Sequence, residues 1–264
     1  MKQDQNILQV DKLSKYFGGL AAVSNCSLKI KKGSITGVIG PNGSGKTTLF
    51  NLIAGNLKSS GGNVVFDDEN ITDVPSYELF SKGLLRTFQI AHEFSNLSVL
   101  ENLMMVPGNQ SGEKIMTALF KPGLVAKEEA VVKEKAKEVV EFLNLGHLSN
   151  ELAGNLSGGQ KKLLELGRTM MVDAKLVLLD EVGAGVNRTL LKDLGTAIEK
   201  LNKEKGYTFC MIEHDMDFIG RLCDPVIVMA EGSVLFDGSV EEAKKDEKVI
   251  ESYLGRGSKL RENN

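Results

Sequence analysis

The sequence predicts an α/β fold with a mostly parallel sheet, and three features of the chain lead to that prediction. An apolar run at 35–39 is followed by a glycine-rich loop and an apolar helical stretch, which together form a strand–loop–helix unit. A second run, 176–179, is apolar throughout, as is typical of strands buried in parallel sheets. From about residue 90 to 155, the apolar residues follow helical periodicity. We therefore expect one domain, 1–264, with a helical subdomain inserted in its core.

The composition is that of an ordinary globular protein. The 264 residues are 42% hydrophobic and 25% charged, and the net charge of -3 gives no cationic surplus for nucleic acid. No run reaches the ~18 apolar residues of a membrane span. We therefore expect a cytoplasmic protein that reaches a membrane only through a partner. The scattered cysteines lack metal-ligand spacing and are expected to be reduced, partly buried thiols: Cys26, Cys210 and Cys223.

Short β-type runs at 7–10 and 26–30 come first, before the strand that feeds the glycine-rich loop. Between them Tyr16 and Phe17 precede a glycine pair. Either ring could stack on a flat adenine ring. An aromatic beside glycines is more often ordinary packing, however, and the residues alone leave both interpretations open.

The loop after 35–39 matches the phosphate-binding pattern G-x-x-x-x-G-K-[ST]. Its glycines let successive N–H groups curl around an anion, and the following helix N-terminus adds its dipole. Lys46 is expected to reach the β- and γ-phosphates, Thr47 to offer a hydroxyl to Mg²⁺, and Gly43 and Gly45 to keep β-carbons away from the phosphate. The alternative is a plain glycine turn before a helix. The predicted nucleotide-binding loop consists of Gly40, Pro41, Asn42, Gly43, Ser44, Gly45, Lys46, Thr47 and Thr48.

The middle of the chain is predicted to be helical. Ser98 and Glu101 have capping-box spacing at the start of one helix. A longer helix, 125–143, has an apolar face and a charged remainder that is most simply solvated, with Glu129 and Lys133 four residues apart. Breaks are expected at 107–108 and 122–123. The predicted apolar face consists of Val125, Val132, Ala136, Val139 and Leu143.

A second glycine pair, Gly158-Gly159, stands at a predicted helix N-terminus with Ser157 in the N-cap position. The residues allow two interpretations, a simple cap with a turn, or a second anion site made by backbone N–H groups. Neither is favoured at this point.

Two carboxylates, Asp180 and Glu181, close the apolar strand at 176–179. Ligands of open α/β sheets lie beyond the carboxyl ends of the strands, where the glycine-rich loop also lies. Asp180 could therefore hold the Mg²⁺ shell, and Glu181 could orient or deprotonate a water. The alternative is acids that simply face solvent.

The last third of the chain continues the alternation of strands and helices. A helix at about 188–204 and a strand at 207–212 lead to His214, which could make a polar contact to a γ-phosphate or be an ordinary cap. A hairpin over 226–236 and amphipathic helices to Leu254 follow.

In this order, the motifs resemble those of ABC-type ATPases over nearly the whole chain. The run Leu156-Ser157-Gly158-Gly159-Gln160 is the most specific, because other phosphate-loop families lack it. The resemblance implies a P-loop NTPase (ABC ATPase) fold with a RecA-like core and an N-terminal antiparallel β subdomain. It also implies a helical subdomain at about 90–155, a short C-terminal helical extension at about 239–264, and ATP and Mg²⁺ as ligands.

The resemblance also implies roles for single residues. Phe17 would stack on adenine with Val23 beneath the ring. Gln89 would touch Mg²⁺ and water in a lid loop that senses the membrane partner. The implied catalytic residues are Glu181, His214 and Gln89, and the implied metal ligands are Thr47, Gln89 and Asp180. The implied signature residues, which act on the ATP of a second subunit in a head-to-tail dimer, are Leu156, Ser157, Gly158, Gly159, Gln160 and Asn187.

Within that family, Arg86-Thr87-Phe88-Gln89 and the segments 184–187 and 212–216 look like those of ATPase subunits of branched-chain (hydrophobic) amino acid importers. The expected partners are transmembrane permease subunits, an identical or sister ATPase and, indirectly, a substrate-binding protein, with the chain peripheral on the inner face of the membrane. Asn187 replaces the more usual Asp, and Val182 replaces the Pro that commonly follows the catalytic Glu. Loss of that Pro relaxes the backbone of Glu181.

Three other functions share parts of this pattern. The ATPase of a lipopolysaccharide-type exporter has a similar signature, but the 86–89 run favours the importer. A soluble ABC ATPase acting on DNA or ribosomes usually carries tandem cassettes or coiled-coil insertions, and the chain has one motif set. A GTP switch would leave the helical subdomain and its signature without a role.

Overall fold

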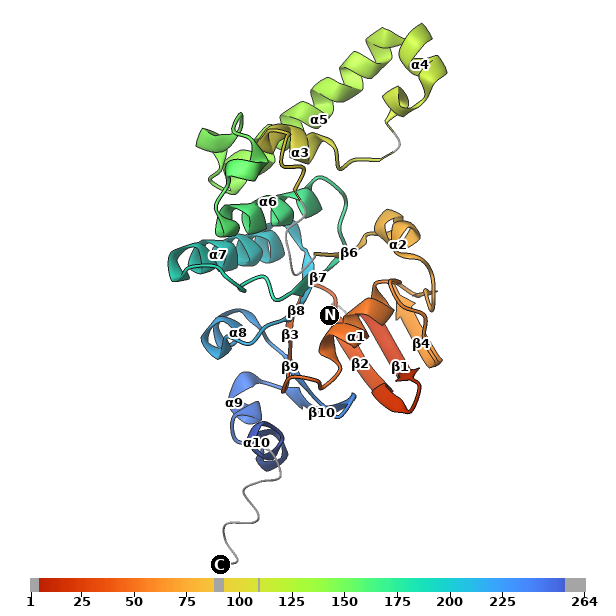
Figure 1. Cartoon of the computed structure of the whole chain (residues 1–264), viewed down its shortest axis with the longest axis vertical. Helices are drawn as coiled ribbons and strands as arrows, with labels where there is room; N and C mark the ends of the chain where they lie inside the picture. The colour runs from red at the N-terminus through yellow and green to blue at the C-terminus, as the bar shows by residue number, and fades with distance from the viewer. Residues whose placement is uncertain (1–4, 88–92, 109, 255–264) are drawn as a thin grey trace, which may run out of the picture. The chain divides into compact units, whose positions relative to one another are not determined.

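A computed structural model of the chain describes residues 5–87, 93–108 and 110–254 (Figure 1). The chain divides into two units. The first comprises Met1–Arg86, Lys175–Gly183 and Glu199–Asn264, and the second comprises Thr87–Ala174 and Ala184–Ile198. None of the helices within the described ranges combines the length and apolar character that crossing a bilayer requires.

The first unit is built on a six-stranded sheet of order β10-β9-β3-β8-β7-β6. Strands β3, β7 and β8 are buried at every position, which explains their continuous apolar runs. The pairs along β9-β3-β8-β7-β6 are parallel, and β10 closes the predicted hairpin antiparallel to β9. The strands are β3 (Ile35–Ile39), β6 (Leu84–Arg86), β7 (Leu176–Asp180), β8 (Thr208–Ile212), β9 (Val226–Ala230) and β10 (Ser233–Gly238).

A separate antiparallel sheet, of order β2-β1-β4-β5, confirms the predicted N-terminal β subdomain. The apolar runs predicted short strands here, but β1 and β2 each extend over 12 residues. They are longer because the ladder continues through exposed polar positions and register shifts as far as the pair Phe17 and Leu20. The strands are β1 (Asn6–Phe17), β2 (Leu20–Lys31), β4 (Gly61–Phe66) and β5 (Glu69–Asn70).

Helices complete the first unit. α1 follows β3 directly through the glycine-rich loop, and α9 and α10 form the end of the described chain, as predicted. Asp215 caps α8 by accepting hydrogen bonds from the N–H groups of Asp217 and Phe218, both at 3.0 Å. The helices are α1 (Lys46–Ile53), α2 (Ser76–Lys82), α8 (Met216–Leu222), α9 (Val240–Ala243) and α10 (Glu247–Leu254).

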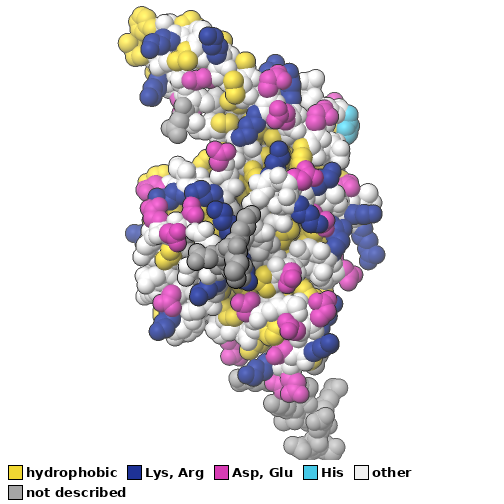
Figure 2. All heavy atoms as spheres, turned by 180° about the vertical axis from the view of Figure 1, so that it is seen from behind, with side chains coloured by type: hydrophobic (Ala, Val, Ile, Leu, Met, Phe, Trp, Pro, Cys, Tyr) yellow, Lys and Arg dark blue, Asp and Glu magenta, His cyan; other side chains and the backbone are white. Residues whose placement is uncertain are grey.

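The second unit is helical in its described part. Ser98 and Glu101 form the predicted capping box of α3, and Pro122, predicted as a break, is the first residue of α5. Exposed apolar side chains gather at the α4 end of this unit (Figure 2). The elements are α3 (Val99–Met104), η1 (Ser111–Glu113), α4 (Ile115–Phe120), α5 (Pro122–Phe142), η2 (Gly146–Leu148), η3 (Ala153–Asn155) and α6 (Gly158–Met170); α7 (Arg188–Lys205) begins in this unit and ends in the first.

The apolar face predicted for 125–143 is buried only in its second half. Ala136, Val139 and Leu143 are at most 3% exposed, whereas Val125 and Val132 are half-buried. The first half of α5 therefore buries less apolar surface than its helical periodicity predicts. Among the described ion pairs, Lys137 pairs with Glu134 at 2.7 Å, three residues away, and the predicted pair of Glu129 with Lys133 is not formed.

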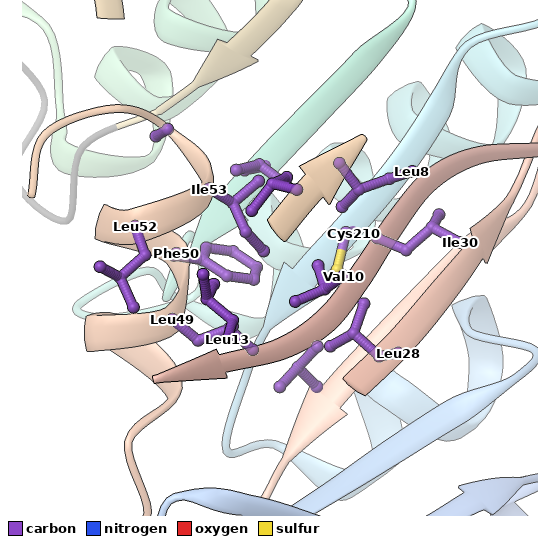
Figure 3. Packing of buried hydrophobic residues seen from close by; sticks show 14 of the residues in the cluster. Leu8, Val10, Leu13, Leu28, Ile30, Leu49, Phe50, Leu52, Ile53 and Cys210 are labelled. Atoms are coloured by element: carbon purple, nitrogen blue, oxygen red, sulfur yellow. The ribbon is translucent and has the colours of Figure 1, made fainter. Parts of the chain in front are cut away.

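The core of the first unit lies between the antiparallel sheet, α1 and the parallel sheet. In Figure 3, Phe50 and Ile53 of α1 point toward Val10 and Leu13 of β1, with Cys210 of β8 in the same cluster. Burial of such side chains is the main force that holds the glycine-rich loop on its scaffold. The cysteines are free and buried as predicted, and burial raises the pKa of Cys26 to about 11 and that of Cys223 to about 12.

Candidate functional site

The glycine-rich loop connects β3 to α1, with Gly45 at the N-cap of the helix in a left-handed conformation (φ 99°). A β-carbon on Gly45 would collide with the carbonyl oxygen of Ala22 in β2. Glycine at this position is therefore required by the close approach of another strand, as well as by the backbone angle. The sequence pattern predicted the glycine but not this neighbour.

Lys46 is the first residue of α1 and is only 6% exposed. Its Nζ donates to the carbonyl oxygens of Gly40 at 2.8 Å and Pro41 at 3.0 Å, so its side chain folds back over the loop. Burial lowers the pKa of the Lys46 ammonium, and the negative charges of Glu181 and Asp180 oppose that shift. The loop thus holds a buried cation that faces two carboxylates.

Asp180 ends β7 with its side chain 3% exposed, and its Oδ2 accepts a hydrogen bond from Nη2 of Arg86 at 2.6 Å. Nη1 of Arg86 donates to Oδ1 of Asn51 on α1, at 2.5 Å. Nδ2 of Asn51 in turn donates to the carbonyl oxygen of Thr47, at 2.9 Å. A chain of contacts therefore connects Thr47 and Asp180, the two described candidates for metal ligands.

Breaking the Arg86–Asp180 pair should destabilise the protein. We expect Arg86→Ala to lower the free energy of unfolding by roughly 3 kcal/mol, because it leaves a buried carboxylate without its counter-charge. Urea denaturation measures the change. As a matched control, Lys82→Ala breaks an ion pair with Glu69 whose side chains are 32% and 59% exposed, and it should cost less than about 1 kcal/mol. Equal costs for the two variants would contradict the stabilising role of Arg86.

Glu181 follows Asp180 and has an unusual backbone for a residue with a side chain (φ 49°). Its N–H donates to the carbonyl oxygen of Ile212 at 2.9 Å, and its Oε1 lies 3.0 Å from Nε2 of His214. A proline at 182 would force Glu181 toward extended angles, so Val182 is compatible with the positive φ in a way that proline is not. The contact brings together residues from the ends of β7 and β8.

Glu213 is a further acidic residue at this edge of the sheet, and it is only 5% exposed. Burial raises the pKa of the Glu213 carboxyl, and hydrogen bonds from the N–H groups of Gly183 and His214 oppose that shift. The hydrogen bond from the N–H of Gly183 is 2.7 Å long, and it fixes the backbone just after Glu181. The sequence contained no signal for this role beyond the position of Glu213 after a buried strand.

The two residues expected near adenine lie in different environments. Phe17, at the end of β1, is 49% exposed, and the Lys15 ammonium lies 5.3 Å from its ring centroid. Val23, in β2, is fully buried and belongs to the core cluster. Phe17 therefore presents a face to solvent on which a base could stack, and the contact of Val23 with a base stays a prediction.

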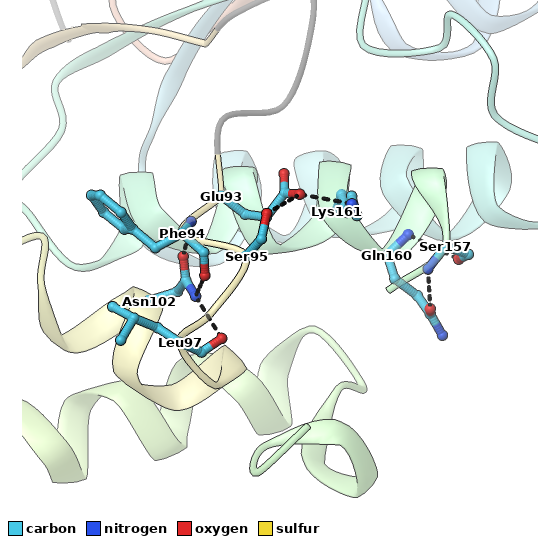
Figure 4. A network of polar contacts seen from close by, with 8 residues as sticks. All are labelled: Glu93, Phe94, Ser95, Leu97, Asn102, Ser157, Gln160 and Lys161. Carbon is cyan, nitrogen blue, oxygen red and sulfur yellow. Dashed lines mark hydrogen bonds and ion pairs between the residues drawn. The ribbon is translucent and has the colours of Figure 1, made fainter. Parts of the chain in front are cut away.

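In the second unit, Ser157 is the N-cap of α6, and the cap is reciprocal (Figure 4). The N–H of Ser157 donates to Oε1 of Gln160 at 2.9 Å, and the N–H of Gln160 donates to Oγ of Ser157 at 3.4 Å. The predicted N-cap at Ser157 is thus confirmed, and a second anion site at this helix N-terminus stays a prediction. Ser157 and Gly158 are both exposed at the N-terminus of α6. Anions bind favourably at such a position.

The two signature glycines differ. A β-carbon on Gly158 would make only an ordinary contact, 3.9 Å from the carbonyl oxygen of Gly185, whereas a β-carbon on Gly159 would collide with the side chain of Leu190 in α7. Gly159 therefore allows α6 and α7 to pack closely. Asn187 caps α7, since its Oδ1 accepts a hydrogen bond from the N–H of Leu190 at 3.0 Å.

Gln89 lies outside the described residues, which resume at Glu93. Oε1 of Glu93 pairs with Nζ of Lys161 on α6 at 2.7 Å (Figure 4), and the bond to Lys161 opposes the effect of burial and leaves the pKa of Glu93 lowered. The fully buried Asn102 donates to the carbonyl oxygens of Phe94 and Ser98, at 3.1 and 2.9 Å, and accepts from the N–H of Phe94 at 2.8 Å. The segment that begins at Glu93 is thus fixed to the signature helix and to α3.

The structure brings the glycine-rich loop, Asp180, Glu181 and His214 to one edge of the six-stranded sheet, beyond the adjacent strands β3, β8 and β7. The predicted adenine contacts, Phe17 and Val23, lie in β1 and β2 of the antiparallel sheet instead. Sequence reasoning missed three polar residues that support the group at the six-stranded sheet. Arg86 was noted only as part of a family likeness, although its place at the end of a strand beside β7 was a usable signal. The other two are Asn51 and Glu213.

The chain was compared with known proteins. Residues 23–184 match the family model described as ABC transporter. A protein from Archaeoglobus fulgidus named "Probable branched-chain amino acid transport ATP-binding protein LivG" is 44% identical, over 94% of this chain and 95% of that protein. The high-affinity branched-chain amino acid transport ATP-binding protein BraF of Pseudomonas aeruginosa is 36% identical, over 94% and 98% of the two chains.

Solved structures agree with these sequence matches. A nucleotide-free ATP-binding cassette from an ABC transporter superposes with a TM-score of 0.82 at 39% identity, covering 96% of this chain and all of the other. The ADP conformation of an ATP-binding cassette of an ABC transporter gives a TM-score of 0.81 at the same identity and coverage.

Proposed function

The chain belongs to the ABC transporter family of ATP-binding proteins, and we propose that it powers an importer of branched-chain or other hydrophobic amino acids by hydrolysing ATP. The observation that carries the proposal is the convergence of Lys46, Asp180, Glu181 and His214 at the ends of three adjacent strands. Such a group can bind a phosphate chain, hold a cation and activate water at one place.

The glycine-rich loop would bind the phosphates of ATP. Two of the three donors of the Lys46 ammonium are taken by loop carbonyls, and the third is available for the β- and γ-phosphates. Loop N–H groups and the N-terminus of α1 would hold the remaining oxygens. Phe17, half exposed at the end of β1, would stack on the adenine.

Thr47 and Asp180 fit a Mg²⁺ ion, because a hydroxyl and a carboxylate are the hard oxygen donors that this ion prefers. Within the described residues no group of three or more His, Cys, Asp and Glu side chains could hold a metal ion by itself. Bound Mg²⁺ would neutralise charge on the β- and γ-phosphates. Gln89 would complete the set.

Glu181 would accept the proton of the attacking water, with His214 as a polar contact to the γ-phosphate. The 3.0 Å contact between their side chains would hold the Glu181 carboxylate in one orientation. Glu213, held by the N–H of Gly183, would fix the backbone that carries Glu181.

The signature residues would act on the ATP of a second subunit, which is a copy of this chain or a sister chain. The exposed Ser157 and Gly158, at the start of α6, would contact the γ-phosphate with the help of the helix dipole. ATP would then stabilise the associated state, and hydrolysis would release it. This cycle would drive permease subunits between inward- and outward-facing forms, with the chain on the inner face of the membrane.

The substrate class rests on the relatives, whose names specify branched-chain amino acid transport. We propose the same class for this chain. An uptake assay tests this substrate class. Vesicles are prepared with the permease subunits, a substrate-binding protein and both ATPases, and the uptake of labelled leucine is compared with that of labelled arginine. Uptake of leucine alone is expected, and uptake of arginine alone would contradict the assignment.

Gln89 is proposed to couple ATP use to transport. In the same vesicles, Gln89→Ala should uncouple the two, so that leucine uptake falls more steeply than phosphate release. The pair of Glu93 with Lys161 offers a path from that segment to the signature helix. A strictly proportional loss of uptake and hydrolysis would show that Gln89 is not the sensor. Gln110→Ala, on the same unit, is the matched control and should leave the ratio unchanged.

A further inference from the structure

The turn that joins β9 to β10 lies against the glycine-rich loop. It consists of Glu231 and Gly232, both with a positive φ (48° and 79°), as a type I′ hairpin turn requires. The N–H of Gly232 donates to the carbonyl oxygen of Ser44 at 3.1 Å. The carbonyl oxygen of Gly232 accepts a hydrogen bond from the N–H of Ser24 in β2, at 2.9 Å. A single turn residue therefore connects the loop to β2.

The turn, the loop and β2 meet here through their backbones. A β-carbon on Gly232 would lie 3.1 Å from the carbonyl oxygen of Ala22 and 3.2 Å from the nitrogen of Ser24. A β-carbon on Gly45, which would collide with the same oxygen of Ala22, would also lie 3.4 Å from Cα of Gly232. Glycine permits so close an approach between backbones. A side chain at position 232 must therefore displace one of the three segments by a few tenths of an ångström.

The hydrogen bond from Gly232 fixes the orientation of one peptide of the loop. In a trans peptide the C=O and the N–H point in opposite directions. Because the carbonyl oxygen of Ser44 points to the turn, the N–H of Gly45 points away from it. A loop that binds phosphate needs its N–H groups directed at the anion. The turn therefore determines which way one donor of the loop faces.

We propose that Gly232 is a positioning residue for the phosphate chain of the nucleotide, and that it acts through the peptide between Ser44 and Gly45. The inference rests on the proposed function, in which the loop binds ATP. The competing explanation is an effect on the base, because Ser24, the other partner of Gly232, follows Val23, the predicted neighbour of adenine. A ligand that has phosphates but no base separates the two explanations.

Titration of the whole chain with ATP and with inorganic tripolyphosphate, each in the presence of Mg²⁺, tests the inference. Gly232→Ala should weaken the binding of both ligands about tenfold, which corresponds to roughly one hydrogen bond to a charged group. The matched control is Gly33→Ala, in the turn between β2 and β3, where φ is 78° and a β-carbon would meet nothing within 4 Å. It introduces the same backbone strain and should bind both ligands like the parent. Urea denaturation checks that both variants are folded.

Hydrogen exchange in the parent chain gives a second measurement that needs no substitution. A bound anion would hold the loop and, with it, the hydrogen bond between Gly232 and Ser44. Tripolyphosphate should therefore slow the exchange of the amide protons of Gly232 and Gly45, and it should leave the exchange of the Gly33 amide proton unchanged.

Three results would overturn the inference. They are equal binding of tripolyphosphate by Gly232→Ala and Gly33→Ala, a loss of affinity in Gly232→Ala for ATP alone, and unchanged exchange at Gly232 when tripolyphosphate is bound to the parent. A chain that shows the expected binding and exchange but drives no uptake contradicts only the proposed function. A parent chain that binds neither ligand contradicts both proposals.

Discussion

Glu181→Gln is expected to reduce ATP turnover at least about a hundredfold while ATP still binds, because the amide keeps a hydrogen-bonding group but cannot accept a proton. The structure supports this expectation through the 3.0 Å contact of Glu181 with His214 and the nearby Lys46 ammonium. Phosphate release at saturating Mg²⁺–ATP measures turnover, and fluorescent nucleotide titration measures binding.

The control for this substitution is Glu204→Gln, at an exposed position near the end of α7, which should turn over ATP like the parent. If Glu181→Gln lost nucleotide binding in parallel with turnover, the role of Glu181 would be in binding the nucleotide and not in catalysis. Unchanged phosphate release would contradict its assignment as the base.

Ser157→Arg should prevent ATP-dependent association and leave nucleotide binding by the single chain intact. A bulky cation at the start of α6 opposes closure by sterics and charge, at a cost of several kcal/mol, or at least about a hundredfold in association. Sedimentation velocity of Glu181→Gln, with and without Ser157→Arg, measures the effect in the presence of ATP.

The chain supplies a matched control for the lost cap. Ser98 caps α3 with the same reciprocal arrangement that Ser157 makes at α6. Ser98→Arg therefore removes an equivalent cap, worth about 1 kcal/mol, and adds the same charge outside the signature. It should leave ATP-dependent association unchanged. An ATP-dependent dimer that survives Ser157→Arg would show that the signature is only a helix cap.

The sequence was most informative where one pattern has one physical cause. The continuous apolar run before Asp180 predicts a strand covered on both faces, and the serine-to-glutamate spacing at 98–101 predicts a reciprocal cap; the structure contains both. The spacing of apolar and turn residues also predicted α7 and the hairpin over 226–236, and the structure contains both. These are local interactions, and local sequence determines them.

Contacts between distant segments could not be predicted in this way. The pairing of Arg86 with Asp180 joins residues 94 positions apart, and the hydrogen bond from Gly183 to Glu213 joins residues 30 apart. Neither side chain carries a spacing signal, because the sheet order that brings the strands together depends on the whole fold. The exposure of α4 is similar: none of its residues is buried, although helical amphipathicity alone would have buried its apolar side chains.

The central claim is that the loop of one chain and the signature of another form one site, and a mixing experiment tests it most directly. Lys46→Ala and Ser157→Arg should each be inactive alone, because each lacks one half of every site. When the two are mixed in equal amounts, turnover should reappear but stay below about a quarter of the parent's. At most about half of the dimers are mixed and each has one complete site of two, and the Ser157→Arg substitution at the second site still opposes closure. No recovery on mixing, at concentrations where the parent is active, or full activity of Ser157→Arg alone, would contradict the account.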